Sequence, residues 1–199
     1  MKPTAEFLAE LRADRHIDAT LRGQRFDFLT TWGLFSPKEI DEGTRLLLDH
    51  MDVNADDDCL DLGCGYGPIG LTLARLAPQG HTLMIDNNFV AVEYANRNVA
   101  HNRIANAEAV PSHGFRDIPN RRFDLIASNL PAKVGKEMWY LYLYDALASL
   151  NSGGRIYLVT INGLRDFVKR AFNEVFGNYD KVKQGKTYTV ALAIKHPTR

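Results

Sequence analysis

The sequence has no long apolar run, and none approaches the roughly 20 residues that a membrane-spanning helix requires. Its N-terminus also lacks the basic segment followed by an apolar one that marks a secretory signal. Cysteine is scarce, with two residues, Cys59 and Cys64. Two cysteines in or beside an apolar run are typical of small core residues in a reducing compartment and cannot form a metal site alone. We therefore expect a cytoplasmic protein with no membrane partner and no metal.

The sequence has no excess of either charge, since 24 Lys and Arg balance 24 Asp and Glu. Without an overall basic field, binding to nucleic acid requires a local patch. A length of 199 residues, 45% of them hydrophobic, suits one globular domain with a short extension. We expect the extension at residues 1–35, as a helix and a hairpin packed on the core, and the main domain at residues 36–199.

The hydrophobic pattern alternates along the chain between short apolar runs and segments with helical spacing. Strands that alternate with helices of 10 to 15 residues predict a parallel sheet covered on both faces. The last two strands are joined by a short turn, which forces an antiparallel pair. We therefore predict an α/β, Rossmann-like fold with a mostly parallel, seven-stranded sheet and a reversed strand near the C-terminus. The expected strands are 17–21, 25–30, 59–62, 82–85, 107–110, 123–127, 155–160, 181–182 and 188–194, and the expected helices are 6–15, 39–51, 67–77, 88–102, 136–150 and 164–176.

The strongest functional signal is the segment 61–70, DLGCGYGPIG, which follows a predicted strand and opens a predicted helix. Glycines there permit positive φ angles and let a ligand approach the backbone, while helix N-terminal amides face that ligand. Asp86 ends the next predicted strand, where a carboxylate can accept both ribose hydroxyls of a nucleoside. Asp61, ahead of the glycines, suits the cationic amino end of S-adenosylmethionine. The expected cofactor-binding residues here are Asp61, Gly63, Cys64, Gly65, Gly67, Asp86 and Asn87.

A competing pattern occupies the same segment. Gly65, Gly67 and Gly70 have the GxGxxG spacing of a dinucleotide fingerprint, which is weak evidence by itself. A carboxylate at Asp61 would repel a pyrophosphate, and the sequence has no obvious second domain for a hydride acceptor. We therefore favour S-adenosylmethionine over a nicotinamide cofactor, and glycines that only turn the chain are a third interpretation.

Several stretches resemble the methyltransferase small domain family of class I S-adenosylmethionine-dependent methyltransferases. They are 61–67 (DLGCGYG), 33–36 (GLFS) and 41–48 (DEGTRLLL), and 128–136 (SNLPAKVGK) resembles the family's second motif, which is usually Asn-Pro-Pro followed by a hydrophobic residue. The resemblance covers about residues 26–195. The family includes guanine-N2 methyltransferases of small-subunit ribosomal RNA, so the resemblance implies an N-methyltransferase with RNA as its substrate.

The resemblance also implies a catalytic group of Asn129, Leu130 and Pro131, with Asn129 beside the cofactor. In the family the matching Asn accepts an N–H of the target amine through its side-chain oxygen, and the next carbonyl accepts the other. This sequence departs from the family in two places, because Leu130 replaces a proline and Ala132 replaces a hydrophobic or aromatic residue that often stacks on the base. Asn-Leu-Pro also resembles the motif of ribosomal RNA adenine dimethyltransferases. That Asn129 only ends a strand stays open.

Two further residues are candidate cofactor contacts. Phe35 is expected to pack near the cofactor, although a core position is an alternative. His113 stands where relatives place an acid near the adenine amine, and it either takes that place or lies on the surface. Basic residues near the second motif and in the C-terminal region form either an RNA-facing patch or a solvated face: Arg116, Arg121, Arg122, Lys133, Lys136, Lys181, Lys183 and Lys186.

We therefore predict methyl transfer from S-adenosylmethionine to an exocyclic amine of a nucleobase, with guanine N2 in ribosomal RNA as the favoured target. One alternative keeps the cofactor but takes a small molecule or a protein amide as substrate. Another is a cofactor-binding module with impaired catalysis, which the altered second motif makes conceivable. A homodimer that adds RNA contacts is a further possibility that no residue pattern decides.

Overall fold

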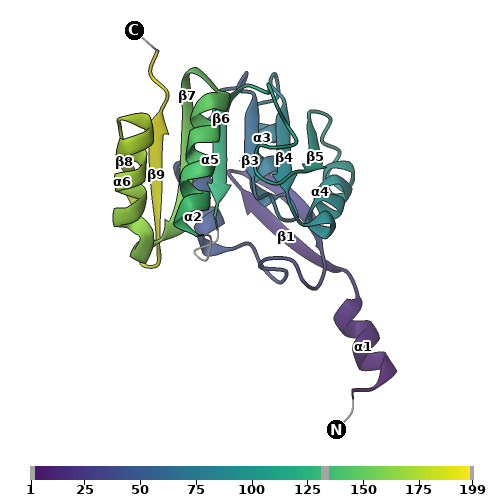
Figure 1. The fold of residues 1–199 in the computed structure, drawn as a ribbon. Coiled ribbons are helices and arrows are strands. Elements are labelled where there is room, and N and C mark those ends of the chain that lie inside the picture. Colours follow the sequence, from purple (N-terminus) through teal and green to yellow (C-terminus); the bar gives the residue numbers. More distant parts are fainter. Residues whose placement is uncertain (1–2, 131–134, 198–199) are drawn as a thin grey trace.

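The computed structural model describes residues 3–130 and 135–197 of the chain. Its main sheet has seven strands in the order β5-β4-β3-β6-β7-β9-β8 (Figure 1). The pairs from β5 to β7 are parallel, and β9 is antiparallel to both of its neighbours. This confirms the predicted fold with one reversed strand near the C-terminus. The strands are β3 (Cys59–Leu62), β4 (Thr82–Asp86), β5 (Ala107–Pro111), β6 (Phe123–Asn129), β7 (Leu150–Ile161), β8 (Asp180–Gln184) and β9 (Tyr188–Ile194).

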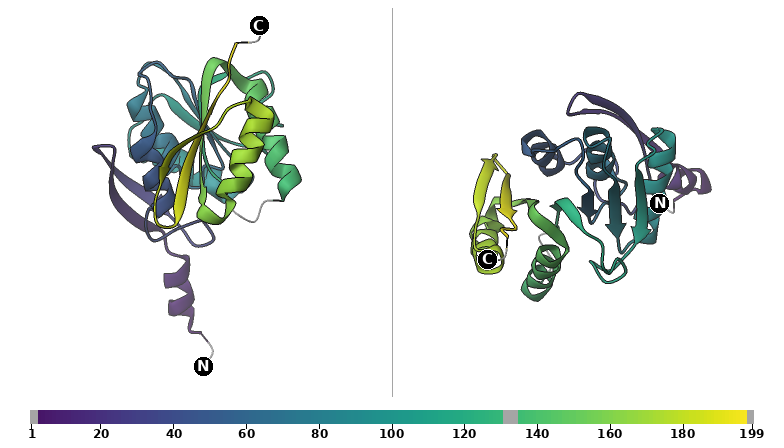
Figure 2. Two further views of the ribbon diagram at one scale, coloured as in Figure 1. Left: turned by 90° about the vertical axis from the view of Figure 1, so that its left-hand side faces the viewer. Right: turned by 90° about the horizontal axis from the view of Figure 1, so that it is seen from above.

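Helices cover both faces of this sheet (Figure 2). One face carries α2 (Glu42–His50), α3 (Pro68–Leu76) and α4 (Phe89–His101). The other carries α5 (Lys136–Ser149) and α6 (Arg165–Phe176), the latter preceded by a 3-10 turn, Asn162–Leu164. Because successive strand residues point to opposite faces, Cys59 belongs to the first of two hydrophobic cores, and Leu60 and Leu62 belong to the second. Asp61 therefore faces the side of α3.

A hairpin of β1 (Arg15–Leu21) and β2 (Gln24–Thr30) forms an outer layer over the first face (Figure 2). Phe26 and Phe28 are fully buried beneath it, and the ring of Phe28 meets that of Tyr66 at a centroid distance of 5.8 Å. Before the hairpin, α1 (Ala5–Arg12) projects away from the body and buries no residue (Figure 1). The predicted division of the chain at residue 35 stays a prediction.

Asparagine side chains of α4 close the free edges of two strands. Asn98 and Asn102, one helical turn apart, each accept a backbone N–H of β2 and donate to a carbonyl of the same strand, at 2.7 to 3.0 Å. Asn96 makes the same pair of bonds with Ala109 of β5, at 2.8 and 2.9 Å. These amides replace the partner strand that an edge otherwise lacks, so α4 holds both the hairpin and the sheet.

Three of the predicted element boundaries differ from the observed ones by three residues or more. The first helix ends at Arg12 rather than residue 15 because Arg15 already pairs in β1. The second begins after Asp41, whose side chain caps it, rather than at residue 39. Strand β7 begins at Leu150 rather than residue 155, and the pair Gly153-Gly154 lies in an irregular stretch inside the strand instead of a turn before it. In the described part of the chain, no helix is long and apolar enough to cross a membrane.

Candidate active site

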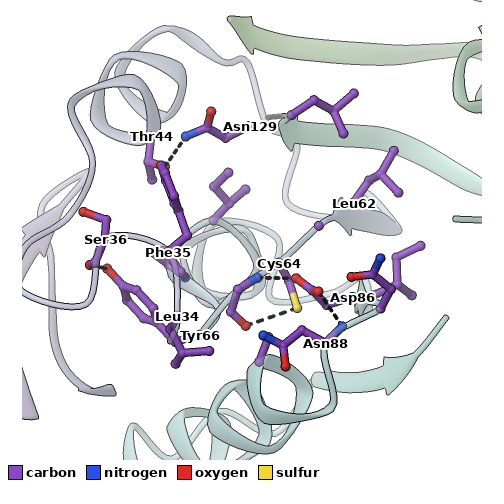
Figure 3. Close-up of a pocket in the computed structure, with 18 of the residues that line it drawn as sticks. Leu34, Phe35, Ser36, Thr44, Leu62, Cys64, Tyr66, Asp86, Asn88 and Asn129 are labelled. Atoms are coloured by element: carbon purple, nitrogen blue, oxygen red, sulfur yellow. Dashed lines mark hydrogen bonds between the residues drawn. The ribbon is translucent and has the colours of Figure 1, made fainter. Parts of the chain in front are cut away.

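A cavity of about 400 Å³ opens at the carboxyl edge of β3, β4 and β6 (Figure 3). In open parallel sheets, ligands bind at this edge, beside the point where the strand order reverses. Here the order reverses between β3 and β6. The walls of the cavity come from the loop after β2, the glycine segment, the ends of β4 and β6, and α5, as follows: Gly33, Leu34, Phe35, Ser36, Asp41, Thr44, Leu62, Gly63, Cys64, Gly65, Tyr66, Pro68, Ile69, Ile85, Asp86, Asn87, Asn88, Ala91, Ser112, Gly114, Asn129, Leu130 and Tyr142.

The glycine segment passes along this cavity with left-handed backbone conformations. The φ angles of Gly63 and Gly65 are +77° and +55°, and a Cβ atom on either would meet nothing within 4 Å. Both glycines therefore leave open space where a ligand can approach the backbone. Gly67, with φ of +95°, begins α3 and has no such space, because a Cβ there would lie 2.6 Å from Leu71. Gly67 shapes the turn and does not line the cavity.

The carboxylate of Asp86 ties two loops of the site together. Its Oδ2 accepts the backbone N–H of Gly65 at 2.9 Å, and its Oδ1 accepts that of Asn88 at 2.9 Å. Each carboxylate oxygen has a second acceptor position. Asp86 is only half-buried and lines the cavity, so these remaining positions are available to hydroxyl groups of a ligand.

Asp61 is fully buried beside the start of α3. Its Oδ2 accepts the backbone N–H of Gly70 at 2.8 Å, and its Oδ1 has no partner among the described residues. Burial raises the pKa of Asp61 to about 7, the charge of Asp86 adds to the rise, and the Gly70 N–H opposes it. A buried carboxylate with one unpaired oxygen suits a nearby cation, which would stabilise its ionised form.

Several N–H groups around the glycine segment are already used within the protein. Those of Gly63 and Cys64 donate to the carbonyl of Ile85, at 2.9 and 3.0 Å. At the start of α3, Pro68 has no N–H, and the N–H of Gly70 is bound to the Asp61 carboxylate. A dinucleotide pyrophosphate needs these amides free and no anion beside them. The geometry therefore argues against the nicotinamide alternative.

At the end of β6, the Asn129 side chain is held in one orientation (Figure 3). Its Nδ2 donates to Asp41 Oδ2 at 2.9 Å and to Thr44 Oγ1 at 3.1 Å. A carboxylate only accepts, so the amide nitrogen must face Asp41. Oδ1 of Asn129 has no hydrogen-bond partner within the described residues, and the side chain lines the cavity. The neighbouring hydroxyl of Ser128 donates to the carbonyl of Leu62 at 2.5 Å, which joins the ends of β6 and β3.

Asp41 has two further bonds beyond Asn129. Its Oδ2 also accepts the N–H of Thr44 at 3.1 Å, as the N-cap of α2, and its Oδ1 accepts the hydroxyl of Tyr188 at 3.2 Å. A Cβ atom on Gly43 would lie 2.8 Å from Asp41 Oδ2 and 3.0 Å from the Tyr188 ring, so this packing requires glycine. Helix α2, β6 and β9 thus meet at one carboxylate.

The loop after the hairpin forms a second wall of the cavity. Gly33 and Ser36 have positive φ angles, of +82° and +46°, and the hydroxyl of Tyr66 donates to the Ser36 carbonyl at 3.3 Å. These constraints place Phe35 against the cavity with 65% of its surface exposed. The core position considered for Phe35 is therefore wrong.

A family model of the methyltransferase small domain matches residues 25–192. The chain belongs to this family. Membership makes it an S-adenosylmethionine-dependent methyltransferase domain and confirms the predictions of the enzyme class and the cofactor. The residues fit that cofactor, because Asp86 offers acceptor positions, the glycines leave open space and Asp61 provides a buried carboxyl group with an unpaired oxygen, which a cation would ionise.

Proteins similar to this chain differ in length. Ribosomal RNA small subunit methyltransferase C of Hamiltonella defensa subsp. Acyrthosiphon pisum (strain 5AT) is 38% identical over 165 residues, 81% of this chain and 48% of the relative. The uncharacterized protein YbxB of Bacillus subtilis (strain 168) is 33% identical over 179 residues, 88% of this chain and 89% of the relative. The T. thermophilus 16S rRNA N2-guanosine methyltransferase RsmC, in complex with AdoMet and guanosine, has a TM-score of 0.83 and 27% identity, and the match covers 92% of this chain and 51% of that one. The chain spans about half the length of these two ribosomal RNA methyltransferases.

In this methyltransferase domain, the cavity brings together most of the residues expected at the cofactor site: Phe35, Gly63, Cys64, Gly65, Asp86, Asn87 and Asn129. Asp61, Gly67 and His113 do not line it. His113 is exposed, while its neighbours Ser112 and Gly114 line the cavity, so the strand end turns the histidine outward. Leu130 lines the cavity, and Pro131 lies outside the described residues.

The sequence assigned no role to Asp41, Thr44 and Tyr142, which all line the cavity. Asp41 and Thr44 belong to the stretch DEGTRLLL that carries the family resemblance, and their distance in sequence from Asn129 concealed the contact. Tyr142 comes from α5, and its ring packs so close to Gly114 that a Cβ atom on that glycine would lie 2.6 Å from the ring. The glycine at position 114 was the local sequence signal of that close approach. Its φ angle in the structure is +61°.

The basic residues do not form a single patch. Arg121 and Arg122 directly precede β6, whereas Asn129 ends it, and a strand of that length separates its ends by about 20 Å. Arg121 also pairs with Glu108 at 3.6 Å. Lys186 lies in the turn before β9, at the same edge as Asn129, and Lys133 lies outside the described residues. Arg121 and Arg122 therefore do not join a patch around the second motif, and a patch formed by the other basic residues stays a prediction.

Proposed function

We propose that this protein methylates an exocyclic amine of a nucleobase and that its target is guanine N2 in ribosomal RNA. The observation that carries the proposal is the fixed orientation of Asn129. Since Asp41 and Thr44 bind its amide nitrogen, Oδ1 is the acceptor that faces the cavity. An acceptor selects a target with an N–H to donate, which an exocyclic amine has.

The adjoining residues complete this arrangement. S-adenosylmethionine supplies an electrophilic methyl group when bound. Asn129 Oδ1 and the Leu130 carbonyl would accept the two N–H groups of the amine and aim its lone pair at that methyl group. Transfer would form one N–C bond as the C–S bond of the cofactor breaks, with S-adenosylhomocysteine as the leaving group, and the surplus proton of the nitrogen would pass to solvent water. Such a displacement depends on positioning more than on acid–base catalysis, which agrees with a site rich in hydrogen-bond acceptors.

Phe35 would compensate for the missing aromatic residue at position 132. Its ring contacts the cavity and solvent at once, with 65% of its surface exposed. Base chemistry in nucleic acid generally requires the base to leave its stack, and an aromatic face stabilises it there. The RNA substrate itself is supported by RsmC, whose structure holds AdoMet and guanosine.

We also retain homodimerisation as a proposal, with the exposed side chains Phe7, Leu8 and Leu11 of α1 as its candidate surface.

The experiment is transfer of a labelled methyl group to small-subunit ribosomal RNA from a strain that lacks the gene, followed by mass spectrometry of the nucleosides. N2-methylguanosine is the expected product with the wild-type protein. The Asn129→Ala variant should bind S-adenosylhomocysteine normally while its turnover falls by orders of magnitude. Methylation of free nucleosides or metabolites alone would favour a small-molecule substrate. Cofactor binding without transfer to any RNA would favour the module with impaired catalysis.

A further inference from the structure

A cluster of side chains that could bind a metal lies where the β1–β2 hairpin meets the end of α4, away from the cavity. His16 of β1, Asp27 of β2 and His101 at the end of α4 bring their donor atoms within 4.8 Å of one another. Nδ1 of His16 lies 3.0 and 3.1 Å from the two Asp27 oxygens, and Nε2 of His101 lies 2.7 Å from Oδ2. None of the three lines the cofactor cavity. We propose that these residues bind one divalent transition-metal ion. We take Zn²⁺ as the ion for the expected geometry and for the test.

The donor set favours such an ion. Two imidazoles and one carboxylate match the ligands of zinc, with bonds of about 2.0 to 2.2 Å that place donor atoms about 3.3 Å apart. The observed N···O separations of 2.7 to 3.1 Å therefore require an expansion of a few tenths of an ångström. Magnesium prefers oxygen ligands, so it does not match this set.

The histidine rings can present lone pairs to the ion. In the described part of the chain, neither Nε2 of His16 nor Nδ1 of His101 has a protein partner, so these outer atoms can carry the N–H of a neutral ring. The inner nitrogens, which face Asp27, then carry the lone pairs that would bind the ion. The two ring centroids are 6.1 Å apart at 70°, which keeps the rings from stacking against each other.

The backbone around the cluster is already fixed. Asn102 binds both the N–H and the carbonyl of Asp27, at 3.0 Å each, and so sets the position of the central carboxylate. The side chains remain 37 to 59% exposed, which leaves an entry path and room for water as a further ligand. An ion here would tie the β1–β2 hairpin to the end of α4, where His101 lies 74 residues after Asp27 in the sequence. The expected consequence is firmer docking of the hairpin.

The test uses tag-free, chelator-treated protein at a mildly alkaline pH, because metal ligands must lose their protons to bind an ion. Titration with Zn²⁺ followed by calorimetry and thermal unfolding should give one equivalent bound and a raised Tm, and Mg²⁺ should give neither. His16→Ala and His101→Ala should each weaken Zn²⁺ binding by more than the about 10- to 100-fold that outer-shell changes cost. Co²⁺ should produce visible absorption bands that both variants lose.

The matched control is His81→Ala, because His81 also contacts a surface carboxylate, that of Glu108 at 3.5 Å, but without a second histidine. This variant should bind Zn²⁺ like the wild type. Absence of stoichiometric Zn²⁺ binding would overturn the proposal, and so would unchanged binding in a folded His101→Ala protein. Since each variant is checked by its S-adenosylhomocysteine affinity, failure of the metal site is distinguishable from misfolding.

Discussion

Asn129 Nδ2 donates to Asp41 Oδ2 at 2.9 Å across 88 residues of sequence. The same oxygen caps α2 by accepting the N–H of Thr44. The start of one helix therefore fixes the side chain that we assign to the target amine. Donation to a carboxylate also draws electron density toward Asn129 Oδ1, which makes that oxygen a stronger acceptor.

The first prediction concerns Asp41. Asp41→Ser should retain the cap of α2, because serine is an equally good N-cap residue, but its shorter side chain cannot also hold Asn129. Turnover should fall at least about tenfold, since loss of one charge-assisted hydrogen bond costs about 1.5 to 3 kcal/mol. Single-turnover methylation and S-adenosylhomocysteine calorimetry measure the two effects separately. Unchanged turnover in Asp41→Ser would remove Asp41 from the positioning of Asn129.

The second prediction concerns the charge of Asp61. Its folded-state pKa of about 7 lies above the ordinary value of 3.8, so the folded protein without ligand keeps a proton that the unfolded chain releases between these pH values. Stability should therefore fall as pH rises from about 4 to 7, by up to roughly 1.4 kcal/mol per pH unit. Asp61→Asn should remove this decline while losing cofactor affinity. Urea unfolding at several pH values tests it, and parallel pH profiles for both proteins would refute it.

The third prediction concerns Asp86. Asp86→Ala releases the N–H groups of Gly65 and Asn88 and removes the proposed ribose acceptor. Affinity for S-adenosylhomocysteine should fall by about 100-fold or more, as expected for two hydrogen bonds to a charged group. Asp117→Ala is the control, because Asp117 also accepts a backbone N–H, that of His113, but lies outside the cavity. Calorimetry should give the control an affinity within about threefold of the wild type. Equal losses in both variants would point to a general effect of removing a carboxylate.

The fourth prediction concerns Asn98. This residue is fully buried, and its amide bonds the N–H and carbonyl of Leu29 and the carbonyl of Tyr66. Asn98→Ala leaves these buried groups without a hydrogen-bond partner. Each such group costs about 1 to 3 kcal/mol, so the free energy of unfolding should fall by about 3 kcal/mol. Asn173→Ala, an exposed helix residue, should stay within about 0.5 kcal/mol. Denaturant unfolding compares them, and equal midpoints would contradict the role of Asn98.

The glycine segment and the alternating pattern predicted the sheet and most of the cofactor site because both depend on local sequence. Asp61 does not line the cavity for a reason of register. It stands one residue before the end of β3, and strand alternation turns its side chain toward α3 and away from the cavity wall. Asp41 and Tyr142 were missed because their contacts depend on where α2 and α5 cross the sheet edge, which no local pattern encodes. The irregular start of β7 was missed because Gly153 and Gly154 are typical turn residues, and only pairing with β6 and Lys195 draws them into the strand.

The asparagine contacts between α4 and β2 also constrain the order of folding. Asp27 and Leu29 are 69 to 75 residues away from the amides that bind them. During synthesis the hairpin leaves the ribosome long before α4. The free edge of β2 therefore stays open to pairing with other chains until the helix docks. Contacts at such separation form late and slow folding. The hairpin is therefore the segment most exposed to aggregation in the nascent chain.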